Sequence, residues 1–396
     1  MTRIVRLANF VTAHSGGLRT ALRCLGEGYR AAGHEAVLVV PGERASDEWT
    51  AQGRVITLPG WPVPGSGGYR VLLGRRRLGA LLDELRPERL EVSDRFTLRW
   101  TGGWARSHNV PAVMVSHESL AGLLRIWRVP PGVRERLADV LNARSAAAYD
   151  DIVCTTAWAA AEFSRIGAGN VRQVPLGVDL EVFHPDRYDP ELRARYAEPG
   201  ELLIVHCSRL SVEKRPARAV DAMRSLRAAE VPAVLVVAGD GPLRARLEHR
   251  ADGLPVHFAG FLADRAEVAR LLATADVVVA PGPVETFGLA ALEALACGTP
   301  VVVSAESALP EVVGVAGVAV SGEGEAFAAG VLALAARPAA TRRAAARRRA
   351  ERFGWPDAVA GFLQAHGVGA HGVGAQGVRA HGVGAHGVAR IAEVTR

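Results

Sequence analysis

The sequence predicts an α/β protein made of two doubly wound, Rossmann-like domains with a ligand-binding cleft between them. Three observations support this fold class. Short runs rich in Val, Ile and Leu alternate with stretches that suit helices along most of the chain. About twelve such runs occur, which is too many strands for one open sheet. A length of 396 residues leaves room for two or three domains, each with its own core.

The first half of the chain begins with a strand and continues as alternating strands and helices. Its apolar runs suit parallel strands that are buried on both faces. Helices fit between them, for example at Leu18–Ala32 and Arg134–Ala148. The predicted strands are Arg3–Asn9, Ala36–Val40, Arg54–Leu58, Arg89–Val92, Ala112–Ser116 and Asp151–Thr155.

The second half repeats the alternation after a proline-containing segment, Val174–Asp189, which we interpret as the linker. This places an N-terminal domain at residues 1–175 and a C-terminal domain at 176–350. A ligand is expected in the cleft between them, at the carboxyl ends of both sheets. The predicted strands are Leu202–Cys207, Ala233–Ala238, Val256–Ala259, Val277–Ala280, Val301–Ser304 and Gly317–Val320.

The C-terminal end changes character. Ala339–Arg352 is expected to be an Arg/Ala helix, and Phe353–Gln364 an amphipathic helix. We expect residues 351–365 to pack back on the N-terminal domain. Residues 366–396 continue as a glycine-rich AHGVG repeat, which predicts a disordered tail. Metal binding by the repeat histidines is the alternative; these are His366, His371, His381 and His386.

Composition narrows the possible partners and compartment. The net charge is +6 and the pI about 9.6, nearly all from arginine, since Lys214 is the only lysine. Nucleic acid is not expected as a partner, because no binding motif accompanies the charge. No apolar run reaches the roughly 18 residues of a membrane-spanning helix, and the first residues suit a strand rather than a signal peptide. The isolated cysteines indicate reduced thiols and a cytoplasmic protein; they are Cys24, Cys154, Cys207 and Cys297.

Two glutamates mark the segment 281–300, PGPVETFGLAALEALACGTP. Glu285 and Glu293 are eight positions apart, and a helical rise of about 1.5 Å per residue would separate them by roughly 12 Å. That is beyond the ~5–9.5 Å between the carboxylates of a glycosidase. The spacing suits two contacts with one elongated ligand. The alternative is two solvated glutamates on a helix.

Two cations follow the strand Leu202–Cys207. Arg209 and Lys214 lie on the loop that leaves its carboxyl end. Fixed cations at this edge of the sheet are what a diphosphate requires. A solvated basic loop is the alternative.

Two further loops follow strands of the first half. Gly16 and Gly17 stand between the first strand and the first helix, where a helix N-terminus offers amide donors and glycine lets a phosphate approach. His117 ends the buried run VMVSHE, although a histidine at a strand end is often structural. No Asp-x-Asp motif occurs in the sequence, so no metal-binding residue is assigned and no obligatory cofactor is expected.

Together, Glu285-x7-Glu293 and Arg209-x4-Lys214 resemble the signature of the retaining glycosyltransferases of family 4, which have the GT-B fold. The matching motifs run from Gly16 to about Trp355. The resemblance implies that Arg209 and Lys214 hold the pyrophosphate of a nucleotide-sugar donor. It also implies that Glu285 contacts the hydroxyls of the donor sugar and Glu293 those of the ribose.

The resemblance assigns the remaining donor contacts less directly. It implies that His117 reaches the donor sugar, that Gly16 and Gly17 lie over the donor phosphates, and that Leu262 lies near the nucleobase. The first-turn amides of the helix after Glu285 are expected to bind phosphate through the helix terminus; the residues are Phe287, Gly288 and Leu289, after Thr286. The catalytic set implied is His117, Arg209, Lys214 and Glu285.

Longer stretches, among them LEVSDRFTLRW and VCTTAWAAAEFSRIGA, are similar to actinobacterial enzymes that transfer mannose from GDP-mannose to phosphatidylinositol dimannoside. This implies a glycolipid acceptor and a peripheral position at the inner face of the plasma membrane. The segment 61–77 combines apolar residues with arginines, as a surface that binds an anionic membrane would; the residues assigned are Tyr69, Arg70, Arg75, Arg76 and Arg77.

Two alternatives remain at this point. One is an enzyme of the same fold that uses a UDP-sugar and a soluble metabolite or a polysaccharide primer as acceptor. The other is a silent sugar-nucleotide sensor, which would be expected to lack a site residue.

Overall fold

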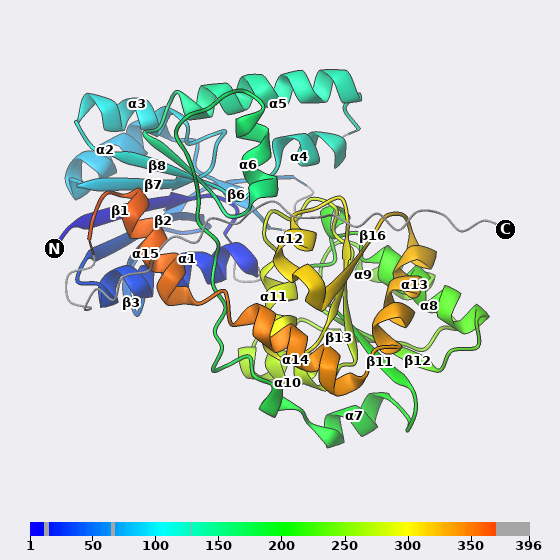
Figure 1. Cartoon of the computed structure of the whole chain (residues 1–396). Helices are drawn as coiled ribbons and strands as arrows, with labels where there is room; N and C mark the ends of the chain where they lie inside the picture. The colour runs from blue at the N-terminus through cyan, green and yellow to red at the C-terminus, as the bar shows by residue number, and fades with distance from the viewer. Residues whose placement is uncertain (12–15, 65–67, 127, 370–396) are drawn as a thin grey trace.

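Two parallel sheets organise the protein. The computed structural model describes residues 1–11, 16–64, 68–126 and 128–369. Within them, an eight-stranded sheet has the order β10-β9-β8-β7-β1-β2-β4-β3, and a six-stranded sheet has the order β13-β12-β11-β14-β15-β16. The first lies in the upper half of Figure 1 and the second in the lower half. We propose that these halves are two domains divided near residue 175.

The first sheet is parallel except at one edge, where β3 runs antiparallel to β4. A separate antiparallel ribbon is formed by β5 (Trp61–Pro62) and β6 (Arg70–Val71). The strands are β1 (Arg3–Ala8), β2 (Glu35–Gly42), β3 (Ser46–Thr50), β4 (Gly53–Pro59), β7 (Arg89–Ser93), β8 (Ala112–Ser116), β9 (Asp151–Cys154) and β10 (Val171–Gln173).

The second sheet is parallel throughout its ladders. Its strands are β11 (Leu202–Cys207), β12 (Ala233–Ala238), β13 (Val256–Gly260), β14 (Val277–Ala280), β15 (Val301–Ser304) and β16 (Gly317–Val320). All twelve predicted strands are present, most within one residue of their predicted ends, so the prediction of two doubly wound α/β units with the GT-B architecture is confirmed.

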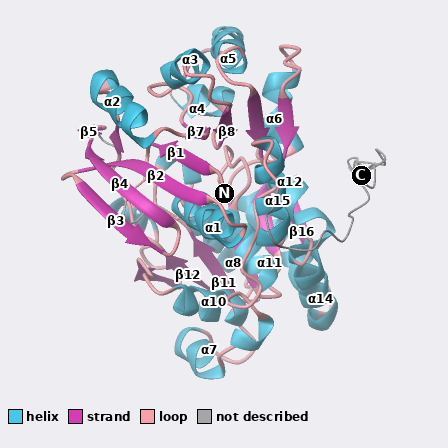
Figure 2. Cartoon of the chain, turned by 90° about the vertical axis from the view of Figure 1, so that its left-hand side faces the viewer, coloured by secondary structure: helices cyan, strands magenta, loops and turns pink. Residues whose placement is uncertain are grey.

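Helices cover both faces of the sheets (Figures 1 and 2). In the first half they are α1 (Gly17–Ala31), α2 (Arg75–Leu85), α3 (Trp100–Ser107), α4 (Leu120–Ile126), α5 (Pro131–Ala146) and α6 (Ala157–Ser164). In the second they are α7 (Pro190–Tyr196), α8 (Ala217–Ala228), α9 (Arg244–Arg250), α10 (Arg265–Thr274), α11 (Leu289–Ala296), α12 (Leu309–Val313), α13 (Gly324–Ala335), α14 (Ala339–Ala350) and α15 (Trp355–Ala365), with 3₁₀ turns η1 (Pro185–Arg187), η2 (Val212–Lys214) and η3 (Gly314–Ala316).

Alternate residues of one strand enter different cores, as burial on both faces of a sheet requires. In β1, Ile4 belongs to a core shared with the C-terminal half, whereas Val5 and Leu7 face a core confined to the N-terminal half. In β11, Leu203 faces the shared core and Ile204 a separate one. The shared core therefore continues across the interface between the two halves.

The chain crosses between the halves twice, and the two crossings lie side by side. Val178 pairs with Gly354 in a parallel bridge, and the Val178 amide donates to the Phe353 carbonyl at 2.9 Å. A Cβ on Gly177 would lie 2.5 Å from the Trp355 nitrogen, so the close approach requires glycine. After the second crossing, α15 packs against α1.

The repeat segment begins inside the fold, not outside it. His366 is 3% exposed, and its Nε2 lies 3.0 Å from the buried Glu91 carboxylate on β7. The His366 carbonyl accepts from Arg89 at 2.7 Å, and the Gly369 carbonyl lies 3.1 Å from His34 Nε2. The prediction of a disordered tail from residue 366 is therefore wrong for residues 366–369, because a buried carboxylate binds the first repeat histidine. The remaining repeats, 370–396, lie outside the described residues.

Candidate active site

The proposed site residues come from loops at the carboxyl ends of parallel strands, where the two halves face each other (Figure 1). On the N-terminal side these loops follow β1 and β8; on the C-terminal side they follow β11 and β14. The connection 239–243 supports the β11 loop, because the Leu210 amide donates to the Asp240 carbonyl and the Leu243 amide to the Leu210 carbonyl. Gly239 has φ +138°, and a Cβ there would overlap the Ser208 carbonyl.

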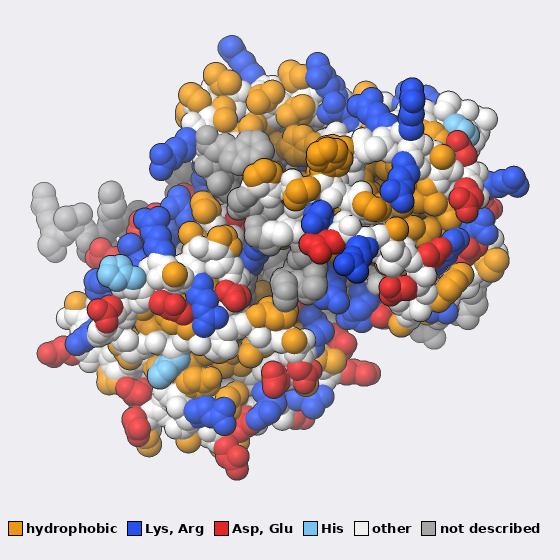
Figure 3. Space-filling view, turned by 180° about the vertical axis from the view of Figure 1, so that it is seen from behind, with side chains coloured by type: hydrophobic (Ala, Val, Ile, Leu, Met, Phe, Trp, Pro, Cys, Tyr) orange, Lys and Arg blue, Asp and Glu red, His pale blue; other side chains and the backbone are white. Residues whose placement is uncertain are grey.

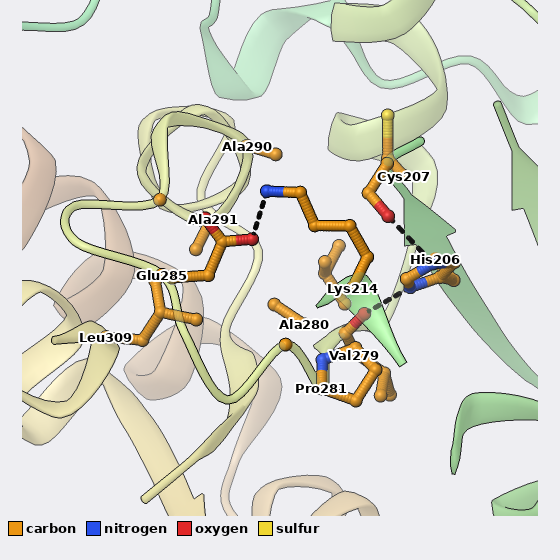
Figure 4. A pocket seen from close by; sticks show the side chains of 14 residues that line it. His206, Cys207, Lys214, Val279, Ala280, Pro281, Glu285, Ala290, Ala291 and Leu309 are labelled. Atoms are coloured by element: carbon orange, nitrogen blue, oxygen red, sulfur yellow. Dashed lines mark hydrogen bonds and ion pairs between the residues drawn. The ribbon is translucent and has the colours of Figure 1, made fainter. Parts of the chain in front are cut away.

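Lys214 and Glu285 form an ion pair within a pocket (Figure 4). Lys214 ends the 3₁₀ turn after β11, and Glu285 lies in the loop after β14; Nζ is 2.5 Å from Oε1. Both side chains are partly exposed, at 30% and 20%. Burial alone would lower the pKa of Lys214, but the adjacent carboxylates, chiefly Glu285, more than offset this and raise it. A permanent ammonium therefore faces the pocket.

The pocket has a volume of about 360 Å³ including its open mouth. Lys214 extends toward Glu285, and His206 lies on the other side of the Lys214 side chain (Figure 4). His206 Nδ1 is 2.9 Å from the Val279 carbonyl and its Nε2 is 3.0 Å from Ser208 Oγ. Burial lowers the pKa of His206. The wall is completed by small residues, including Ala280, Gly282, Gly288, Ala290 and Ala291.

Arg209 lies on the same loop as Lys214, as predicted, but it also reaches the other half of the molecule. Its guanidinium carbon lies 4.3 Å from the centre of the Tyr69 ring, in cation–π contact. Tyr69 in turn packs edge-on against Phe10. The structure thus places Tyr69 in the interface beside Arg209, apart from the arginines with which it was grouped by sequence.

Glu293 is held at the edge of the same region by a cation. It lies on α11, its side chain is 11% exposed, and Arg265 Nη2 contacts it at 2.9 Å. Burial raises the pKa of Glu293, although Arg265 opposes the shift. The Arg265 guanidinium also stacks over Phe183.

The helix that carries Glu293 begins after Glu285, whereas the separation of about 12 Å had been calculated for a helix that includes both glutamates. Glu285 and the next three residues are not helical, and α11 starts at Leu289. The calculation that used a helical rise from Glu285 to Glu293 was therefore wrong. Gly288 precedes the helix at φ +80°, and a Cβ there would overlap Leu309. Phe287 is buried and packs against Phe353, so only its backbone is available to a ligand.

Two helix N-termini meet at the interface. A Cβ built on Gly17, the first residue of α1, would lie 3.8 Å from Leu289 Cδ1 at the start of α11. Gly16 has open space around its Cα. The first turns of α1 and α11 are therefore neighbours across the interface, and the amides of a helix N-terminus can bind an anion. The other residues of the predicted glycine loop, 12–15, lie outside the described residues.

His117 follows β8, and its Nε2 is 3.1 Å from Ser93 Oγ on β7. Burial lowers the pKa of His117 to about 4, with Glu91 raising it and Arg95 lowering it further. The imidazole is therefore neutral at physiological pH. Burial raises the pKa of the neighbouring Glu118 to about 7, against the effect of Arg95.

The remaining predicted residues lie elsewhere. Arg70 donates to the Gly60 carbonyl at 2.9 Å and pairs with Glu43 at 3.0 Å. Arg75–Arg77 form the exposed first turn of α2. Leu262 is partly buried against the shared core.

Sequence reasoning missed three residues that the structure brings to the site: His206, Arg265 and Thr286. Arg265 begins a helix directly after the loop that contains Leu262. Its place next to a loop already assigned to the donor could have identified it from the sequence. Thr286 lies within the recognised motif but was considered only for its backbone amide. His206 lies within a strand, where only the structure reveals that its ring faces the pocket.

Over the described residues, no cluster of three or more His, Cys, Asp or Glu side chains is arranged to hold a metal ion. The cysteines are free thiols. Among the described helices, none is long and apolar enough to span a bilayer. The residues gathered at the site offer cations, helix amides and two carboxylates, a set that we propose suits an anionic ligand.

Comparisons with known proteins agree with this arrangement. Residues 16–178 match the family described as glycosyl transferase 4-like domain, and residues 201–337 match glycosyl transferases group 1. The chain is 52% identical over 372 residues to the GDP-mannose-dependent alpha-(1-6)-phosphatidylinositol dimannoside mannosyltransferase of Mycobacterium tuberculosis, covering 92% of this chain and 96% of the relative. It is 33% identical to D-inositol 3-phosphate glycosyltransferase of Xylanimonas cellulosilytica, over 69% of this chain and 71% of that relative.

Solved structures show the same fold. Sucrose-phosphate synthase from Thermosynechococcus elongatus superposes with a TM-score of 0.72 at 21% identity, covering 92% of this chain and 98% of that one. A structure of Anabaena Alr3699/HepE in complex with UDP and glucose gives a TM-score of 0.71 at 19% identity, covering 92% and 99%. Two family models match most of the chain, and one relative is 52% identical over nearly all of it. The chain therefore belongs to the family 4 glycosyltransferases of the GT-B fold.

Proposed function

We propose that this enzyme transfers an α-mannosyl residue from GDP-mannose to a phosphatidylinositol dimannoside, with retention of anomeric configuration. The observation that carries the proposal is the 52% identity, over nearly all of both chains, to the mycobacterial enzyme named for that reaction. The site is compatible with it, because Lys214 and Glu285 line a pocket whose wall includes the first turn of α11 at Ala290 and Ala291.

The donor would exchange the internal ion pair for contacts with the substrate. The diphosphate would take Lys214 and Arg209 as charge-assisted partners. Glu285, released from Lys214, would accept hydrogen bonds from sugar hydroxyls, and Glu293 would accept them from the ribose. His117, neutral at working pH, would orient the sugar from the N-terminal side.

Catalysis would then rest on positioning and on stabilising the leaving group. The acceptor hydroxyl attacks the anomeric carbon on the face from which the diphosphate departs, and a donor phosphate oxygen takes its proton. Lys214, Arg209 and the α11 amides stabilise the departing diphosphate. No metal is required in this scheme, since fixed cations supply the charge.

We propose that the acceptor lipid is reached where the N-terminal half of the protein contacts an anionic membrane. Three apolar side chains of α5 are exposed at helical spacing: Val133 (58%), Leu137 (40%) and Val140 (48%). Arg136 and Arg144 on the same helix are exposed as well. Figure 3 shows hydrophobic and basic side chains interspersed over this upper part of the molecule. Such a surface, together with Arg75–Arg77, suits a peripheral contact with anionic lipid.

Co-sedimentation with vesicles of phosphatidylcholine and phosphatidylinositol tests the membrane surface. Leu137→Glu combined with Val140→Glu is expected to reduce binding at least tenfold, since two inserted side chains become charged. Leu332→Glu, at a 38% exposed position of α13, is the control and should bind like the wild type. Equal binding by the α5 variant would contradict this assignment.

A donor panel tests the reaction. The full chain is incubated with GDP-mannose, GDP-glucose, UDP-glucose and UDP-N-acetylglucosamine, with EDTA, with and without phosphatidylinositol dimannoside. The proposal expects turnover of GDP-mannose that increases with the lipid. Turnover of a UDP-sugar with a soluble acceptor would leave the family membership intact but would refute the proposed donor and acceptor.

A further inference from the structure

Thr286 lies in the donor-side loop, residues 281–288 between β14 and α11, and contacts the N-terminal half of the molecule. It is 8% exposed and lies between Glu285, which pairs with Lys214, and Phe287, which is buried in the shared core. Its Oγ1 donates to the His117 carbonyl at 2.7 Å. One side chain therefore links the loop of Glu285 directly to the backbone of the histidine across the interface.

The backbone of Thr286 makes a second connection to the same half. Its carbonyl accepts from Thr156 Oγ1 at 2.9 Å and from Thr155 Oγ1 at 3.2 Å. Both threonines are 1% exposed and follow β9, and Thr156 also caps α6 by accepting from the Ala159 amide. Three hydrogen bonds thus bring Thr286 to the carboxyl ends of two neighbouring strands, β8 and β9.

Other contacts also join the halves, among them Arg209 over the Tyr69 ring and Arg265 with Thr20 Oγ1 at 3.3 Å. Arg125 pairs with Glu306 at 2.8 Å with both side chains 39% exposed, so the pair contributes little to a specific geometry. Glu311 accepts from the amides of Ala157 and Trp158 at the exposed start of α6. The Thr286 bonds are buried, hence directional and costly to leave unmade.

We propose that Thr286 is a positioning residue that holds Glu285 and His117 at the separation needed for transfer, by fastening the donor-side loop to β8 and β9. This inference rests on the proposed transferase function. Of the residues assigned to the nucleotide, Arg209, Lys214 and Glu293 belong to the C-terminal half, and Gly16 and Gly17 to the N-terminal half. We expect the three charged side chains to dominate GDP affinity, whereas transfer needs both halves together.

The test is a kinetic comparison of Thr286→Val with wild type, using GDP binding and sugar transfer as separate readouts. Valine keeps the shape but leaves the His117 carbonyl without its donor. We expect kcat to fall about tenfold, the size of one lost buried hydrogen bond, and the Kd for GDP to change less than twofold. Thr286→Ser, which restores the hydroxyl, should recover most of the lost kcat.

Thr101→Val is the matched control. Thr101 is fully buried, and its Oγ1 also donates to a backbone carbonyl, that of Leu98, at 2.7 Å, but both partners lie in the N-terminal half. This variant loses the same kind of bond, and its kcat should stay within twofold of wild type. A melting curve for each variant confirms that it is folded.

Thr155→Val provides an independent variant, because the Thr155 hydroxyl donates to the Thr286 carbonyl. It should lower kcat in the same direction as Thr286→Val with GDP binding unchanged. Unaltered kcat in both variants, or an equal loss of GDP affinity and kcat, would overturn the inference.

The controls separate this inference from the proposed function. The ratio of variant to wild-type kcat is measured with whichever donor the wild type turns over. If the wild type uses a donor other than GDP-mannose, the proposed function fails, and the ratio still decides whether Thr286 positions the site.

Discussion

Lys214 and Glu285 neutralise each other in the structure, and this sets how substitutions at either position should behave. The pair is partly buried, so each charge would lack its partner if the other were removed. A bound donor supplies a negative diphosphate to one and hydroxyl groups to the other. We propose that the ion pair is a resting arrangement, in which the two charges balance each other until a donor enters.

At Glu285, Glu285→Gln should lower transfer at least about 100-fold, since a preorganised charged contact to the reacting sugar is lost. The fold should be retained, because Glu285 faces the pocket. Initial rates and a melting curve give both readouts. Glu267→Gln, at an exposed position of α10, is the control, and near-normal turnover of the Glu285 variant would refute its role.

Lys214→Ala is expected to weaken GDP binding by about 1.5–3 kcal/mol, the size of a charge-assisted hydrogen bond. Isothermal titration calorimetry measures the change. Arg246→Ala, an exposed cation on α9, should leave GDP affinity unaltered. Equal affinity in the wild type and the Lys214 variant would remove Lys214 from the donor site.

His117 should remain neutral throughout the pH range of activity, because burial lowers its pKa from 6.5 to about 4. Between pH 4 and pH 6.5, His117 is protonated in the unfolded chain but not in the native protein. This histidine therefore destabilises the fold progressively as pH falls from 6.5 to 4, and is without effect above 6.5. An NMR titration of its ring resonances should show no midpoint above pH 5.5; a midpoint near 6.5 would contradict the assignment.

At the scale of elements, most of the parallel strands were predictable because they are short runs rich in Val, Ile and Leu. β8, β11, β12 and β14 have the predicted bounds. β3, SDEWT, could not be recognised, since it is an exposed antiparallel edge strand with polar residues at most positions. Short β5, β6 and β10 gave no periodic signal either.

The site was predictable to the extent that its residues share one loop or one motif. Arg209, Lys214, Glu285 and Glu293 do. The start of α11 was placed too early, because Gly288 at positive φ delays the helix and sequence gives no direct sign of this. Arg265 and Thr286 act through partners distant in sequence, Glu293 and His117, which only the fold brings near.

The first repeat of the C-terminal segment is an element of the N-terminal half. The side chains of His366 and Glu91 are 0% and 1% exposed. The Glu91 carboxylate also accepts a hydrogen bond from the Tyr29 hydroxyl at 2.7 Å. Burial would raise the pKa of Glu91, but His366, Arg6 and Tyr29 together lower it. The carboxylate is thus kept charged by partners from three different elements.

Two truncations test this arrangement. Ending the chain after Gly369 should leave stability and activity near those of the full chain. Ending it after Ala365 removes His366 and should lower the free energy of unfolding by about 3 kcal/mol, as for a broken buried pair. Denaturant unfolding compares the two, and His366→Gln in the full chain separates the side chain from the peptide. Equal stability of both truncations would show that the first repeat is not an anchor.

For the whole molecule, the two crossings at Val178 and Gly354 lie together, and we propose that the site lies where the halves that they connect meet. Motion about these crossings that separated His117 from Glu285 would have to break the Thr286 bonds to His117, Thr155 and Thr156. We therefore propose that nucleotide binding depends mainly on the C-terminal half and that transfer depends on both.

Fixed cations predict independence from divalent metal. Lys214 and Arg209 supply the charge that a metal would otherwise provide to the leaving diphosphate. Transfer rates in excess EDTA should equal those in Mg²⁺ within twofold. A loss of more than tenfold in EDTA, reversed by Mg²⁺ or Mn²⁺, would contradict this part of the account.

Retaining transfer of mannose to a phosphatidylinositol dimannoside fixes the anomeric configuration of the product, which NMR can measure. The full chain is supplied with GDP-mannose labelled with ¹³C at the anomeric carbon, together with the purified lipid acceptor. The account predicts one new α-linked mannosyl resonance on the lipid. A β-linked product, or the absence of labelled mannose on the lipid, would refute the proposed reaction.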